Sequence, residues 1–273
     1  MARPRARADA ELVRRGLARS REHAVELIAA GRVQSAGATI AKPATAIERA
    51  APLHVIESTA DDEWASRGAH KLLGALTRFG ADGLSIEGRR CLDAGASTGG
   101  FTDVLLREGA REVVAADVGY GQLVWRLQND PRVTVLDRTN VRHLTPEQTG
   151  GPVDLVVSDL SFISLRLVLP ALMACTHPGA DIVPMVKPQF EVGKERLGSG
   201  GVVRDPELRA EAVREVAEFA HTLGLRTVGA VASPLPGPSG NVEYFLWLKA
   251  DGQGQPQSEL AAMITRAVEE GPQ

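Results

Sequence analysis

The segment that most constrains the fold is a glycine-rich turn between two short apolar runs. Cys91-Leu92-Asp93-Ala94 leads into Gly95-Ala96-Ser97-Thr98-Gly99-Gly100, and the next apolar run, 113–116, ends at Asp117. This order predicts a buried strand, a tight turn, a helix and a second strand that ends in a carboxylate. Glycines let such a turn pass close to a bound nucleoside, where a Cβ would clash. A carboxylate at the tip of the second strand can accept hydrogen bonds from both ribose hydroxyls.

The glycine spacing indicates which cofactor this turn binds. The pattern Asp-x-Gly-x-x-x-Gly-Gly is closer to the turn that binds S-adenosylmethionine than to the G-x-G-x-x-G turn that binds NAD, so it favours methyl transfer over hydride transfer. NAD and flavin folds share the strand-turn-helix layout, so the turn alone leaves those cofactors open. The candidate cofactor-binding residues are Asp93, Gly95, Ser97, Thr98, Gly99, Gly100 and Asp117.

Apolar runs and helical patterns alternate along the rest of the chain. The runs are 90–95, 112–117, 133–136, 153–158, 181–186, 227–232 and 244–248. Helical patterns occupy 68–79, 101–108, 121–129, 165–175, 206–223 and 258–269. The alternation predicts an α/β, Rossmann-like fold, in which helices cover both faces of a mainly parallel, seven-stranded sheet. The last run follows its neighbour through a short Pro/Gly loop without a helix, which predicts an antiparallel strand at the sheet edge.

The net charge of −3 hides an asymmetry between the two ends of the chain. Residues 1–50 hold ten basic and five acidic side chains, a charge of +5, so the remainder carries −8. A basic segment on an acidic body favours contact with a polyanion. Scattered arginines on a solvated helix face would give the same count, so this alternative stays open.

Other patterns exclude several classes of protein. No apolar run approaches the roughly 18 residues that span a bilayer, and the basic start of the chain lacks the apolar stretch of a secretory signal. We therefore expect a cytoplasmic protein that makes no membrane contact. Cys91 and Cys175 lie inside apolar segments, which is typical of reduced core residues, and no histidine or cysteine shows metal-ligand spacing, so we expect no metal site.

Two domains are predicted. Helical patterns over 9–18 and from Ser20 onward, followed by short strand patterns that end near Glu57, predict a small α+β domain over residues 1–60. The polar, acidic stretch 58–63 is typical of a linker, which we place at 61–66. Residues 67–273 then form the α/β domain.

The first domain resembles S-four RNA-binding domains. The resemblance lies in Leu17-Ala18-Arg19-Ser20-Arg21, in Gly31-Arg32-Val33 and in Lys42-Pro43. It departs at Ser35-Ala36-Gly37, where that family carries Val-Asn-Gly, so the turn glycine is kept and an asparagine contact is lost. The resemblance implies that the RNA contacts are Arg5, Arg7, Arg19, Arg21 and Lys42.

Residues 64–249 resemble the FtsJ-type ribose methyltransferases, and the two domains together resemble the TlyA family. The matching stretches are Ser66–Leu72, Ser158–Ser164, Val186–Glu191 and Ser239–Tyr244. The resemblance implies an enzyme that uses S-adenosylmethionine to methylate the ribose 2′-oxygen of cytidines in 16S and 23S ribosomal RNA. We expect a monomer by default. Ribosomal RNA or ribosomal subunits would be its partners.

The same resemblance implies a catalytic set of Lys71, Asp159, Lys187 and Glu243. A ribose hydroxyl is a poor nucleophile until a neighbour takes its proton. Lys187 and Asp159 each follow an apolar strand, and ligands of open α/β sheets bind at the carboxyl ends of strands. We expect Asp159 to hold Lys187 and to lie near the sulfonium of the donor, and Glu243 to orient Lys71.

Each of these residues also has an ordinary structural explanation. Lys187 could extend to solvent, Asp159 could cap a helix, and Glu243 could be an edge-strand charge. Phe162 could stack on a base, but we predict that it fills the core. The alternatives to an enzyme are a non-catalytic RNA-binding assembly factor and a membrane-lytic haemolysin, and the latter is disfavoured because no export signal or membrane segment is present.

Overall fold

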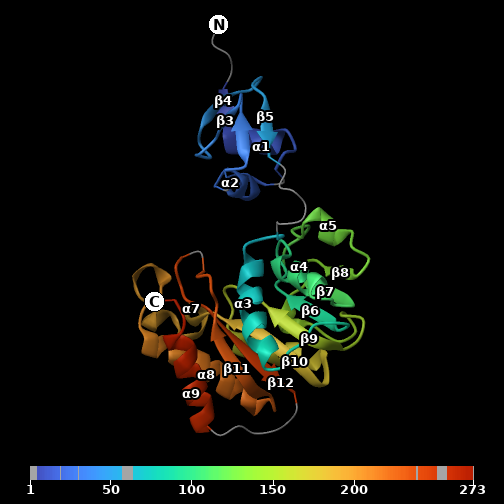
Figure 1. Ribbon diagram of the computed structural model, residues 1–273, viewed down its shortest axis with the longest axis vertical. Helices are drawn as coiled ribbons and strands as arrows, with labels where there is room; N and C mark the ends of the chain where they lie inside the picture. The colour runs from blue at the N-terminus through green and yellow to red at the C-terminus, as the bar shows by residue number, and fades with distance from the viewer. Residues whose placement is uncertain are drawn as a thin grey trace. The chain divides into compact units, whose positions relative to one another are not determined.

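The computed structural model describes residues 5–18, 20–29, 31–56, 64–237, 239–250 and 257–272 (Figure 1). The chain divides into two compact units, Met1–Glu63 and Trp64–Gln273. Of the linker predicted at 61–66, residues 61–63 lie outside the described residues, and residues 64–66 belong to the second unit. We describe each unit by itself.

The first unit packs two helices against short strands. Its elements are β1 (Arg5–Arg7), α1 (Ala8–Arg14), α2 (Arg21–Ala29), β2 (Val33–Ser35), β3 (Ala38–Thr39), β4 (Ala46–Glu48) and β5 (Leu53–Val55). β1 pairs with β4, while β2 lies between β3 and β5, and every pair is antiparallel. Leu12, Ile28 and Val33 lie in its apolar core. The Ser20 hydroxyl caps the second helix, where it accepts the amide N–H of His23 at 3.2 Å.

The second unit is built around a seven-stranded sheet. Its strands are β6 (Arg90–Ala94), β7 (Glu112–Ala116), β8 (Val133–Leu136), β9 (Val153–Ser158), β10 (Thr176–Val186), β11 (Arg226–Ala232) and β12 (Tyr244–Lys249). Its α-helices are α3 (Gly68–Ala81), α4 (Gly100–Arg107), α5 (Trp125–Gln128), α6 (Leu169–Ala174), α7 (Pro188–Glu191), α8 (Pro206–Thr222) and α9 (Gln257–Glu269). Short 3₁₀ turns are η1 (Val141–His143), η2 (Leu165–Leu167), η3 (Lys194–Arg196) and η4 (Ser199–Gly201).

The order of strands across this sheet is β11-β12-β10-β9-β6-β7-β8. β12 runs antiparallel to both of its neighbours, so the hairpin of β11 and β12 closes one side of an otherwise parallel sheet. Helices α3 and α4 contribute to the apolar core on one face of the sheet, and α6, α8 and α9 to the core on the other. The predicted α/β fold with both faces covered is therefore confirmed.

Three predicted helices are shorter than expected. The one predicted over 165–175 is divided into the 3₁₀ turn η2 and the short α6. The other two are α1 in the first unit and α5 in the second. Helix α1 ends at Arg14 because Gly16 takes a φ of +70° two residues later. Helix α5, predicted over 121–129, covers only Trp125–Gln128. The chain before it forms a loop, in which Gly121 has a φ of +61° and its amide N–H donates to the Asp137 carboxylate at 3.1 Å.

Candidate active site

Four ionisable side chains from distant parts of the second unit form one connected group. The Nζ of Lys71, on α3, lies 2.6 Å from Oε2 of Glu243, the residue before β12. The Nζ of Lys187, just after β10, lies 2.6 Å from Oδ1 of Asp159, just after β9, and 4.0 Å from Oε1 of Glu243. Glu243 thus lies between two ammonium groups, and Asp159 holds the second one.

Burial separates this group from ordinary surface charges. The side chains of Lys71, Lys187 and Glu243 are 11%, 8% and 1% exposed. Lys187 therefore does not extend to solvent, and Glu243 is not an exposed edge charge. The helix-capping alternative for Asp159 is also wrong, because Ser164 caps the following 3₁₀ turn η2 and Asp159 pairs with Lys187.

An exposed hydroxyl completes the surroundings of Lys187. Its Nζ donates to Oγ of Ser161 at 3.1 Å, and Ser161 lies in the loop that follows β9. The ammonium group therefore has two carboxylates behind it and a solvent-exposed hydroxyl beside it. This arrangement can hold a proton on a buried amine that lies beside a solvent-exposed residue.

Phe162 contradicts the core position predicted for it. Its side chain is 91% exposed, and its backbone has a φ of +63°, which is rare for a residue with a bulky side chain. Its ring lies 5.2 Å from that of Phe190, between centroids. The loop that carries Asp159 and Ser161 thus also presents an aromatic face to solvent.

The glycine turn predicted from sequence follows β6 directly. A Cβ on Gly95 would lie 2.5 Å from the carbonyl oxygen of Asp159, and one on Gly99 would collide with Leu123 and Leu127. Both glycines also have positive φ angles, +93° and +100°. Only glycine fits these two positions, and the first brings the turn against the loop of the lysine-carboxylate group.

Asp93 is the fully buried carboxyl group behind this turn. One of its oxygens accepts the Thr102 hydroxyl at 2.7 Å, while the other has no hydrogen-bond partner. Burial raises the pKa of Asp93 to about 7, and the carboxylates of Asp159 and Asp117 add to the rise. A positively charged group bound in front of the turn would oppose this rise.

The carboxylate of Asp117 is fixed at the tip of β7. Its two oxygens accept the amide N–H groups of Ser97, at 2.8 Å, and Gly119, at 2.7 Å. The carbonyl oxygen of Thr98 accepts the Val124 amide at 3.1 Å, and Gly100 opens α4. The predicted turn residues and Asp117 therefore gather at the carboxyl ends of β6 and β7.

A small depression beside Asp117 contains two polar residues that the sequence analysis missed. Its lining includes Ser97, Asp117, Gln122 and Asp137. Asp137 follows β8 in the same way that Asp117 follows β7. That position after an apolar strand was the signal that would have identified it.

The predicted RNA-binding residues lie on the first unit. Both Arg7 and Arg21 contact the buried Asp9, at 2.9 and 3.0 Å, and their side chains are 53% and 58% exposed. The amide of Asp9 donates to Pro43, next to the exposed Lys42, at 3.1 Å. Arg5 is exposed on β1, and Arg19 lies outside the described residues.

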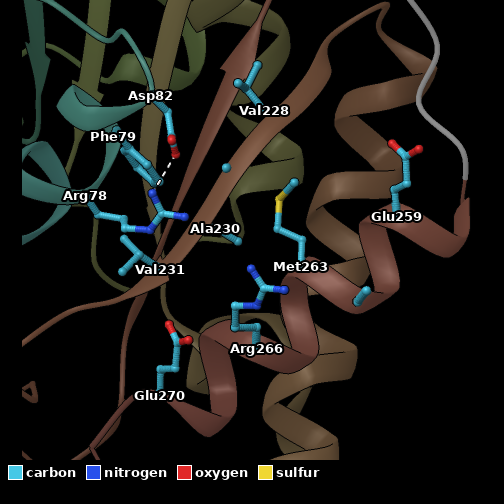
Figure 2. A pocket seen from close by; sticks show the side chains of 12 residues that line it. Arg78, Phe79, Asp82, Val228, Ala230, Val231, Glu259, Met263, Arg266 and Glu270 are labelled. Atoms are coloured by element: carbon cyan, nitrogen blue, oxygen red, sulfur yellow. Dashed lines mark hydrogen bonds and ion pairs between the residues drawn. The ribbon is translucent and has the colours of Figure 1, made fainter.

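A cavity of about 300 Å³ lies elsewhere in the second unit, between α3, β11 and α9 (Figure 2). Apolar side chains such as Val228 and Met263 line it, and charged ones surround them. Arg78 and Asp82 form an ion pair of 2.6 Å at its edge (Figure 2). None of the predicted site residues lines this cavity, so it is separate from the lysine-carboxylate group.

Neither a metal site nor a membrane-spanning helix is present among the residues that the structure describes. There, no group of three or more histidine, cysteine, aspartate or glutamate side chains could hold a metal ion. No helix among the described residues is long and apolar enough to cross a bilayer. Cys91 and Cys175 are buried free thiols, and burial raises the pKa of Cys91 to about 12.

Comparison with known proteins is consistent with this geometry. Residues 64–250 match the family of FtsJ-like methyltransferases. The chain is 62% identical over 269 residues to the 16S/23S rRNA (cytidine-2′-O)-methyltransferase TlyA of Mycobacterium tuberculosis, covering 98% of this chain and 99% of the relative. It is 35% identical to Hemolysin A of Brachyspira hyodysenteriae, covering 84% and 94% of the two chains. A solved structure of a hemolysin-like protein from Streptococcus thermophilus superposes with a TM-score of 0.74 at 36% identity, covering 98% of each chain.

Proposed function

This chain belongs to the FtsJ-like methyltransferase family, and from that premise we propose that it methylates the ribose 2′-oxygen of cytidines in 16S and 23S ribosomal RNA. S-adenosylmethionine is the proposed donor. The observation that carries the proposal is the buried Lys187, which contacts two carboxylates and one exposed hydroxyl next to the glycine turn.

The residues around the turn fit S-adenosylmethionine. Asp117 has the position of a ribose ligand, and Gln122 and Asp137 add polar groups beside it. The unpartnered oxygen of the buried Asp93 suits a positively charged donor group. When bound there, the donor supplies the methyl group.

Lys187 is the proposed base for the reaction. Once its Nζ is unprotonated, it can accept the proton of the ribose 2′-hydroxyl while the oxygen forms its bond to the methyl carbon and the carbon–sulfur bond breaks. Asp159 and Glu243 stabilise the ammonium that results, because each lies within 4.0 Å of it. Lys71 balances the second charge of this carboxylate pair and keeps Glu243 in place.

A nucleotide substrate is favoured by the aromatic surface next to this base. Phe162 follows Asp159 by three residues, and its ring is exposed. Every nucleobase has a face that can stack on such a ring. The first unit would provide a second contact with the RNA. Arg7 and Arg21 both pair with the buried Asp9 there, and their side chains are more than half exposed. We assign this unit to S-four-type RNA binding, with ribosomal subunits in the cytoplasm as the partner.

The test is methyl transfer to purified ribosomal subunits. Small and large subunits that lack the modification are incubated with the protein and isotope-labelled S-adenosylmethionine, and ribose methylation is mapped by mass spectrometry. We expect label on cytidine ribose in both RNAs. Label on a base, or on no RNA while the donor still binds, would overturn the proposal, and the second result would favour a non-catalytic assembly factor. A liposome-leakage assay on the same sample tests the lytic alternative.

A further inference from the structure

A third buried carboxylate lies close to the proposed site but outside its lysine-carboxylate group. Glu191 is the last residue of α7, the short helix that starts immediately after Lys187. Its side chain is 1% exposed. A carboxylate is rarely buried without a structural or functional requirement, because its desolvation is costly.

Both oxygens of Glu191 bind the loop that follows β9. Oε2 accepts the hydroxyl of Ser164 at 2.6 Å, and Oε1 accepts the amide N–H of Leu165 at 2.8 Å. That loop carries Asp159, Ser161 and Phe162. Glu191 therefore connects the segment after β10, which carries Lys187, to the segment after β9, which carries the side chains that surround Lys187.

Arg166 adds a second connection between the same two segments. Its Nη2 donates to the backbone carbonyl of Glu191 at 3.2 Å, and its Nε lies 3.6 Å from the Glu191 carboxylate. Its Nη1 also lies 3.1 Å from the carboxylate of Glu215 on α8. Burial raises the pKa of Glu191, whereas Ser164, the Leu165 amide and Arg166 oppose that rise, so the loop itself stabilises the carboxylate.

The backbone of Phe162 is the part of this loop that needs support. Its φ of +63° is unfavourable for a residue of this kind and persists only where neighbouring contacts enforce it. On one side its ring packs on Phe190, the neighbour of Glu191. On the other side the chain is held at Ser164 and Leu165, two and three residues later.

We propose that Glu191 is a positioning residue, which holds the 159–165 loop in its substrate-ready shape before RNA binds. It touches none of the reacting groups and acts through Phe162, Ser161 and Asp159. The inference rests on the proposed function, because the loop is the place where the target nucleotide would meet Lys187. It adds to that function the residue that keeps the aromatic face in place.

The first test compares Glu191→Ala and Glu191→Gln with the wild-type protein. Glutamine keeps an oxygen that can accept one of the two loop hydrogen bonds, and alanine keeps neither. We expect single-turnover methyl transfer to fall roughly 10- to 100-fold in the alanine variant and to recover in large part with glutamine, because small displacements of reacting groups have effects of this size. Calorimetric affinity for S-adenosylmethionine should not change. Glu215→Ala is the matched control, since it removes the other carboxylate that faces Arg166 without touching the loop, and it should behave as wild type.

A double-variant cycle separates positioning from general destabilisation. If Glu191 acts through the loop, Glu191→Ala should reduce the rate much less in a Phe162→Ala background than in the wild-type background. If its effect were only a loss of stability, the two rate reductions would multiply. Multiplying effects would overturn the inference, as would a Glu191→Ala protein with the wild-type rate.

Hydrogen exchange gives a readout that does not require catalysis. In the full-length protein, Glu191→Ala should speed amide exchange over residues 159–168, Glu191→Gln should speed it less, and Glu215→Ala should leave it as in the wild type. Unchanged exchange in the alanine variant would overturn the inference even if the enzyme proved to have a different substrate. If the exchange differences are as expected but the wild-type protein methylates no ribosomal RNA, only the proposed function is overturned. If the alanine variant does not fold, the same comparison is made between the glutamine variant and wild type.

Discussion

The two units use buried carboxylates in opposite ways. In the first unit, Asp9 is buried but its partners Arg7 and Arg21 are more than half exposed, so the carboxylate holds two cations that face solvent. In the second unit the cations themselves are buried, since Lys71 and Lys187 are about one-tenth exposed and lie against Glu243 and Asp159.

The difference fits two kinds of task. Exposed guanidinium groups that pair with one buried carboxylate can contact phosphates over a broad surface without losing much hydration. Buried ammonium groups in contact with carboxylates interact strongly at a single site, where one proton is held or released. The first unit therefore has the character of a recognition surface, and the second that of a reaction site.

The largest effect should come from removing the buried cation. Lys187→Ala is expected to reduce single-turnover methyl transfer by about two to four orders of magnitude, the usual contribution of a general base. The affinities for S-adenosylmethionine and for ribosomal subunits should stay near wild type. A variant that transfers methyl at the wild-type rate would show that Lys187 is not the base. The contrast between a recognition surface and a reaction site would then fail.

Neutralising the exposed cations should affect binding instead. Arg7→Gln together with Arg21→Gln is expected to weaken subunit binding roughly 100-fold and to reduce the slope of log affinity against log salt by about two, because two phosphate contacts are lost. The control is Arg111→Gln with Arg132→Gln, which changes the net charge equally at the amino ends of β7 and β8. Equal losses in both proteins would mean that overall charge, not the Asp9 pair, attracts the RNA.

Asp117→Ala should weaken binding of the donor to the second unit and leave RNA binding unchanged. The variant loses a charge-assisted hydrogen bond to the donor ribose, about 1.5–3 kcal/mol, or roughly 10- to 150-fold in affinity. Isothermal titration with S-adenosylmethionine measures the loss, and subunit binding should not change. If donor affinity is preserved, Asp117 lies outside the donor pocket.

The smallest effects concern pH, and they have opposite signs for the two buried aspartates. The pKa of Asp93 is raised to about 7. The contribution of this group to the free energy of unfolding is therefore fully present below about pH 4 and is lost as pH rises towards 7. Arginine hydrogen bonds hold the pKa of Asp9 well below its usual range, so its contribution is present above about pH 4 and is lost as pH falls below that value.

Thermal melts of the donor-free protein between pH 3 and 8 check these signs. Relative to wild type, Asp93→Asn should gain stability as pH rises, while Asp9→Asn should lose it. The same pH dependence in both variants would contradict the contrast between an unpaired and a doubly paired carboxylate.

Much of the fold could be predicted because its signals are local. The apolar runs, the glycine turn and the residues that follow the strands each depend on a few neighbouring side chains, and the sheet forms around them. Resemblance to a known family also predicted the contacts of Lys71 with Glu243 and of Lys187 with Asp159, and both contacts are present. The catalytic roles of these residues remain predictions.

Other features could not be predicted because they depend on distant partners. Phe162 looked like a core residue, since an aromatic side chain among apolar neighbours is usually buried, but a positive φ turns it to solvent. The helix predicted over 121–129 lacks its first part, where Gly121 has a positive φ and its amide N–H donates to Asp137. Glu191 gave no signal in the sequence that its carboxylate would hold the neighbouring loop.

The sequence by itself determined the local pieces of this protein: its strands, its glycine turn, its basic first unit and the polar residues at the strand ends. These follow from backbone preferences and side-chain periodicity, which act over a few residues. The tertiary structure alone decided which of those pieces meet. Lys71 and Glu243 are 172 residues apart in the chain, and they touch because the sheet places β12 beside β10 and α3 packs in the apolar core on that face of the sheet. Burial and exposure follow from the same assembly, because only the folded chain determines which charges lose water and which keep it.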